Sequence, residues 1–125
     1  MAVSEFQAIH AVALQMAAAL DTYEADTDAM VAAWPDLERY RTVSGDVDRL
    51  RMYSSSLPAT SVQWAELLIA HAQLVHYLWR DCYGEGGGSA EAFRQVRDHH
   101  ADCIAALRSR CARLARSRHP PPHAA

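Results

Sequence analysis

Lysine is absent from this 125-residue sequence, and all twelve of its basic residues are arginine. The absence excludes catalysis through a lysine Schiff base and excludes a phosphate-binding P-loop, which requires a lysine. Cysteine is sparse as well: Cys82, Cys103 and Cys111 are too few, and odd in number, for a disulfide framework. We therefore expect reduced thiols and a cytoplasmic location, in a bacterial-type cytosol.

Long apolar runs are also missing. No window approaches the roughly 18 uncharged apolar residues of a membrane-spanning helix. Glu5 and His10 interrupt the alanine-rich start, and no basic segment precedes it, which argues against a signal peptide. Half of the residues are hydrophobic and 22% are charged, a composition typical of a soluble globular protein.

Proline and glycine divide the chain into four segments, each with helical periodicity. Apolar residues recur at steps of three and four, as in Phe6, Ile9, Ala13, Met16, Leu20 and Tyr23. These stripes predict helices over about 4–34, 36–56, 60–83 and 89–117, and Gly45 permits a kink in the second. The third helix has the broadest stripe, which Leu68, Ile69, Val75 and Trp79 extend, and we expect it to be the most buried.

No alternating run of β-branched residues predicts a strand, and no internal repeat is found. Four helices with short connections favour an all-α fold, a single antiparallel up-down-up-down four-helix bundle over residues 1–118. The last residues, 119–125 (HPPPHAA), are predicted to form a flexible proline-rich tail.

Charge is distributed unevenly along the chain. Residues 1–38 contain seven acidic residues and no basic one, whereas residues 101–125 contain five arginines against Asp102 alone. Cations near a helix C-terminus interact favourably with the helix dipole, which gives the arginines a structural explanation. In an antiparallel bundle the acidic end of the first helix would lie near Arg94 and Arg97, with the five arginines at the opposite pole. Such poles favour association with a partner.

The stretch RQVRDHHADC, residues 94–103, is the densest group of chemically versatile side chains. His100 and Cys103 lie on the apolar stripe of their predicted helix, one turn apart, and such a pair suits two ligands of a tetrahedral zinc. With His71 and His10 from other helices they form an alternative metal site, for zinc or iron. No CxxC, HExxH or ExxH motif accompanies them, so we expect no bound cofactor and interpret them as core or boundary residues.

Arg94 and His99 offer a second alternative. Their Arg-x4-His spacing resembles the R-x4-6-H motif of HEPN-fold ribonucleases, which are small helical bundles that cleave RNA. The resemblance implies an RNA-cleaving toxin with Arg94 and His99 as its catalytic residues. The chain as a whole is acidic, however, and nucleic acid is not the partner that its composition favours.

The remaining features favour a small non-catalytic adaptor, chaperone-like or regulatory protein that binds another protein. Two surfaces are candidates, an arginine-rich end of the fourth helix and an aromatic edge late in the third. A homo-oligomer is compatible with either, and a membrane partner is not expected. The predicted partner-binding residues are Arg108, Arg110, Arg113, Arg116, Arg118, Tyr77, Trp79 and Tyr83.

Overall fold

All regular secondary structure in the described part of the chain is helical, as the sequence predicts. A computed structural model describes residues 3–82, 84 and 90–116. In these residues the elements are α1 (Val3–Ala32), α2 (Leu37–Ser55), the short 3-10 helix η1 (Pro58–Thr60), α3 (Ser61–Cys82) and α4 (Ala90–Arg116). No strand occurs in this part of the chain. The predicted tail, residues 119–125, lies outside the described residues.

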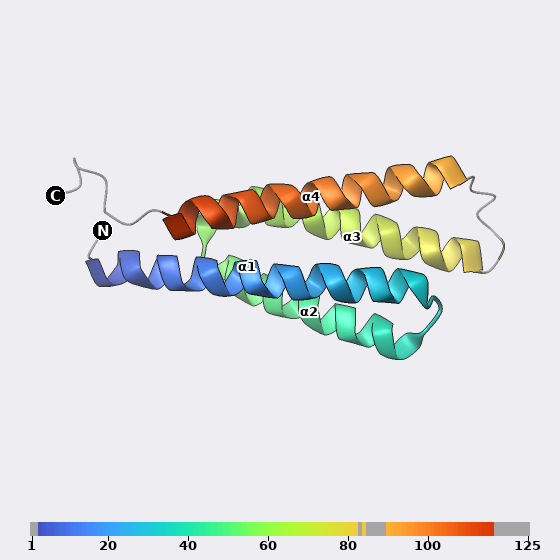
Figure 1. The fold of residues 1–125 in the computed structure, drawn as a ribbon, viewed down its shortest axis with the longest axis horizontal. Coiled ribbons are helices and arrows are strands. Elements are labelled where there is room, and N and C mark those ends of the chain that lie inside the picture. Colours follow the sequence, from blue (N-terminus) through green and yellow to red (C-terminus); the bar gives the residue numbers. More distant parts are fainter. Residues whose placement is uncertain (1–2, 83, 85–89, 117–125) are drawn as a thin grey trace.

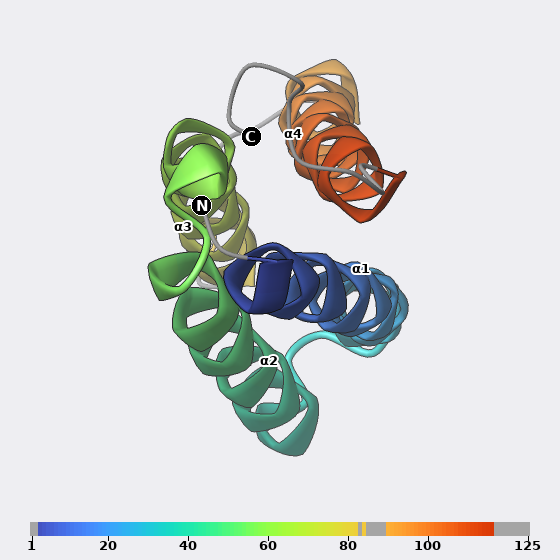
Figure 2. The ribbon, with the colours of Figure 1, turned by 90° about the vertical axis from the view of Figure 1, so that its left-hand side faces the viewer.

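The four helices lie alongside one another in an elongated molecule (Figure 1). Helix α1 packs against both α2 and α4, and α3 packs against α4, whereas α2 and α3 meet over a smaller area (Figure 2). The ion pairs between α1 and α4 run in opposite chain order: Asp21 contacts Arg108, and Asp28 contacts Arg97. These two helices are therefore antiparallel. Within the described ranges, no helix is both long and apolar enough to cross a membrane.

Short polar contacts fix the connections between the helices. The side chain of Asp36 accepts hydrogen bonds from the backbone N–H groups of Glu38 and Arg39, which caps the start of α2. After α2, the Thr60 hydroxyl donates to the Leu57 carbonyl oxygen at 2.7 Å and lies 2.9 Å from the Ser54 hydroxyl. These buried contacts satisfy polar groups where the chain turns from α2 into α3.

The core follows the predicted stripes, with one correction. Ile69 is 59% exposed, although the predicted stripe of the third helix includes it. The buried residues of α3 are Leu67, Ala70, Leu74 and Leu78. Ile69 lies about 100° around the helix from Ala70, so it projects away from this narrow stripe. Leu68, Val75 and Trp79 are half-buried, so the predicted stripe is too broad only at Ile69.

Candidate functional site

An aromatic pocket lies where the end of α1, the end of α3 and the start of α4 meet. Its volume is about 360 Å³, and its lining residues are Val31, Trp34, Tyr77, Leu78, Asp81, Ala90 and Phe93. The rings of Tyr77 and Phe93 stack with their centroids 5.2 Å apart and their planes at 23°. This stack joins α3 to α4 at the wall of the pocket.

A second aromatic group supports the pocket from the side. Trp34 makes an edge-on contact with Trp79, with ring centroids 4.6 Å apart, and Tyr40 contacts both indoles at 6.2 Å. This packing fixes the orientation of Trp34, which also lines the pocket. Of the residues predicted for the aromatic edge, Tyr77 lines the pocket and Trp79 packs behind it, while Tyr83 lies outside the described residues.

Two of the predicted site histidines, His71 and His100, both contact the side chain of Tyr23. Tyr23 was not predicted as a site residue. The hydroxyl oxygen of Tyr23 lies 2.8 Å from His71 Nδ1 and 2.7 Å from His100 Nε2. A hydroxyl has one proton, so it donates to one imidazole and accepts from the N–H of the other. Tyr23 is fully buried and His100 is 3% exposed, which makes this network a bridge between α1, α3 and α4.

Burial keeps this network uncharged near neutral pH. Desolvation, with His71 and Arg97 acting in the same direction, lowers the pKa of His100 to about 4. Desolvation also lowers the pKa of His71 and raises that of the Tyr23 hydroxyl above its usual range. A neutral hydrogen-bonded triad is therefore the form that the core stabilises.

The alternative metal site is only partly assembled. His71 and His100 converge, but His10 lies about 20 Å along α1 from Tyr23. The Cys103 sulfur lies 3.8 Å from His99 Nε2. Across the ranges that the structure describes, no three His, Cys, Asp or Glu side chains are placed to hold a metal ion.

Arg94 and His99 are not brought together. Both are exposed on α4, and a spacing of five residues places them about 140° apart around the helix. Arg94 instead pairs with Glu91 at 3.1 Å, and His99 faces Cys103. The ribonuclease alternative thus gains no geometric support, and it stays a prediction.

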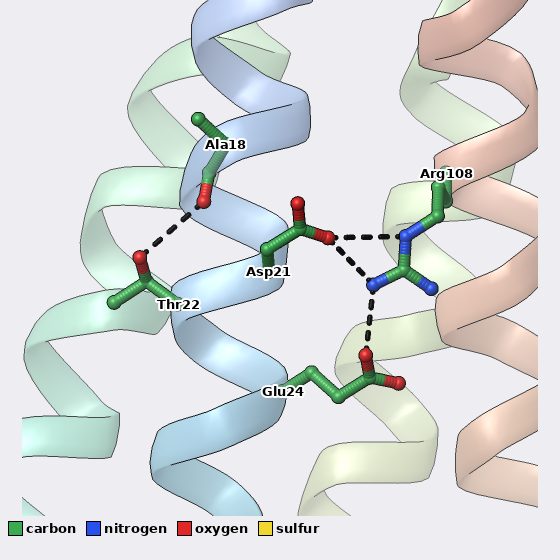
Figure 3. A network of polar contacts seen from close by, with 5 residues as sticks. All are labelled: Ala18, Asp21, Thr22, Glu24 and Arg108. Carbon is green, nitrogen blue, oxygen red and sulfur yellow. Dashed lines mark hydrogen bonds and ion pairs between the residues drawn. The ribbon is translucent and has the colours of Figure 1, made fainter.

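The five predicted partner-binding arginines, Arg108 to Arg118, differ in whether they form ion pairs with other residues of the chain. Arg108 bonds two acidic residues of α1: its Nη2 donates to Asp21 at 2.8 Å and to Glu24 at 2.9 Å, and its Nε donates to Asp21 at 3.2 Å (Figure 3). Arg113 and Arg116 are exposed, and neither forms an ion pair with a described residue. Arg110 is half-buried, and Arg118 lies outside the described residues. The arginines free to meet a partner are thus those nearest the end of α4.

Replacing Arg108 by methionine tests whether its ion pairs hold α1 to α4. We expect a loss of about 1 kcal/mol in the free energy of unfolding, because the pairs are partly exposed and screened by solvent. The loss should shrink as salt is raised from about 0.05 M to 1 M. Urea denaturation at both salt concentrations measures it. Arg51→Met, which breaks an exposed pair within α2, is the matched control and should cost less.

Sequence analysis missed a buried acidic residue on α2. Asp46 is 6% exposed, its Oδ1 lies 3.8 Å from Arg49, and its Oδ2 has no hydrogen-bond partner among the described residues. Burial, together with the neighbouring Asp26 carboxyl group, raises the pKa of Asp46 to about 7. A signal was present: Asp46 lies three residues after Val43 and four before Leu50, on the buried stripe of α2.

Comparisons with known proteins find no match to this chain. The chain matches no protein-family model, and no curated protein and no solved structure is significantly similar to it.

Proposed function

We propose that this chain is a small non-catalytic adaptor, chaperone-like or regulatory protein that acts by binding another protein. The aromatic pocket between α1, α3 and α4 carries the proposal. Its volume of about 360 Å³ is at the small end of the range for ligand pockets, and it suits one or two side chains of a partner. Aromatic residues in such pockets supply most of the energy of many protein interfaces.

The same proposal includes the finer architecture and the location. An up-down-up-down bundle is supported by the antiparallel ion pairs of α1 and α4 and by the order of the helices in Figure 1. A kink at Gly45 would have to be a bend within a continuous helix, since α2 is helical from Leu37 to Ser55. Free thiols at Cys103 and Cys111, both buried, are compatible with a reducing cytoplasm.

Partner binding at the pocket is tested by crosslinking and by mutation. A photoreactive amino acid at position 93 should crosslink one protein in cells, whereas the same group at Met52, an exposed residue of α2, should not. With that protein purified, Phe93→Ala should weaken binding at least about tenfold. Val62→Ala, at the exposed start of α3, is the control and should leave binding unchanged. Equal affinities of the two variants would contradict the proposal.

Metal binding is the second candidate, because one specific contact favours it. His71 Nδ1 and His100 Nε2 both approach the Tyr23 oxygen within 2.8 Å, so three potential ligand atoms converge in the core. A metal there would need a further ligand and the displacement of these hydrogen bonds. Native mass spectrometry of protein purified without chelator distinguishes this candidate from partner binding, because it reports stoichiometric metal directly.

A further inference from the structure

The aromatic pocket has an acidic rim in addition to its stacked rings. Asp81 lines the pocket and is exposed. Within the described residues it forms no ion pair. The stacked rings of Tyr77 and Phe93 line the pocket, and Trp34 borders them from the segment between α1 and α2. The pocket therefore offers flat apolar surfaces next to an unpaired negative charge.

This combination suits a proline-rich segment with a basic residue. Polyproline II segments dock on grooves lined by aromatic rings, at a small entropic cost because proline already restricts the backbone. A cation beside the prolines would pair with a carboxylate at the rim of the groove. The chain contains such a segment itself, since Arg118 and His119 precede Pro120, Pro121 and Pro122, all of them outside the described residues.

We infer that the pocket of one copy binds the segment Arg118–Pro122 of a second copy, with the prolines on Tyr77 and Phe93 and with Arg118 paired to Asp81. The inference rests on the proposed function and names the partner as another copy of this chain. The charge pattern agrees with it, because the arginine-rich end of α4 would face a rim whose acidic residue lacks a partner in the described part of the chain.

The segment cannot reach the pocket of its own copy. Phe93 and Arg116 are both in α4, and 23 residues of α-helix separate them by about 35 Å. The six residues from Arg116 to Pro122 span at most about 20 Å even when fully extended. Docking must therefore occur between molecules, in a head-to-tail contact that forms either a closed ring or an open chain.

Complementation between two full-length variants tests the inference. One variant carries Pro120→Ala, Pro121→Ala and Pro122→Ala and retains the pocket, and the other carries Phe93→Ala and retains the prolines. Sedimentation velocity of the wild type at about 0.1 mM should show species larger than the monomer. Each variant alone should associate at least about tenfold more weakly. An equimolar mixture should recover a complex of one copy of each.

The mixture separates loss of folding from loss of docking, since recovery requires a working segment from one variant and a working pocket from the other. A wild type that stays monomeric up to about 0.5 mM, or a triple proline variant that associates as the wild type does, would overturn the inference. The proposed function is tested separately: a crosslink from position 93 to a different protein would support it and overturn self-docking.

Discussion

Replacing Asp46 by asparagine is expected to raise the free energy of unfolding by about 2–4 kcal/mol near pH 8. Burial beside Asp26 raises the pKa of Asp46 to about 7, so the folded chain holds this proton more tightly than the unfolded chain does. Between the ordinary carboxyl pKa near 4 and about 7, stability therefore falls as the pH rises. Asparagine has nearly the same shape but no ionisable group, so the variant avoids the cost of ionising a buried carboxyl group at high pH.

Urea denaturation followed by circular dichroism at about pH 8 and about pH 4.5 measures the effect. The variant should exceed the wild type at the higher pH, and the difference should shrink to about 1 kcal/mol at the lower one. Asp48→Asn is the matched control, because Asp48 is on the same helix but its side chain is 73% exposed. A loss of stability at pH 8 would show instead that the Asp46 carboxylate is stabilised by Arg49.

The titration of His100 opposes that of Asp46. Because burial lowers the pKa of His100 to about 4, the unfolded chain binds more protons than the folded one between about 4 and 6.5. As the pH falls through this window, the protonation of His100 therefore lowers the free energy of unfolding by up to about 3 kcal/mol. Protonation of Asp46 is favoured over the same window and offsets the loss. Asp46→Asn should thus also make the protein more sensitive to acid.

Helical periodicity made four helices and most of the core predictable. Residues such as Ala13, Met16 and Cys103 are buried where the stripes placed them, because a period of 3.6 residues assigns a face to each position. Periodicity did not predict which residues of neighbouring helices contact each other. His71, His100 and Tyr23 were each on a predicted stripe, but their contact depends on how each helix is rotated and shifted against its neighbours, which a single periodic pattern leaves open.

Polar residues in the core were missed for a different reason. Thr27 lies in the mostly polar run from Asp21 to Asp28, yet it is 1% exposed, because it is four residues after Tyr23 and on the same face of α1. Asp46 was overlooked in the same way, because residue type was given more weight than position. The pocket was not predictable either, since Trp34 lies after α1, Tyr77 is in α3 and Phe93 is in α4, and the three converge only in the folded chain.

Replacing Tyr23 by phenylalanine is expected to lower the free energy of unfolding by about 2–4 kcal/mol near pH 7.5. The substitution keeps the ring and its packing but removes the oxygen that both His71 Nδ1 and His100 Nε2 contact. Two imidazole nitrogens then lose a partner at once, and the nitrogen of His100, which is 3% exposed, has no solvent to replace it. Denaturant unfolding of the variant and the wild type under identical conditions measures the difference.

The expected loss depends little on pH. Near pH 7.5 both imidazoles are neutral, so the Tyr23 hydroxyl can donate to one and accept from the other. Near pH 4 His100 begins to bind a proton, and its Nε2 then donates to the hydroxyl, which can still donate to His71, so the loss in the variant should persist as the pH falls. Tyr53→Phe, at a half-buried residue of α2, is the control and should change stability by less than about 0.5 kcal/mol. If Tyr23→Phe costs no more than that control near pH 7.5, the two hydrogen bonds do not hold α1, α3 and α4 together, and packing of the ring alone accounts for its burial.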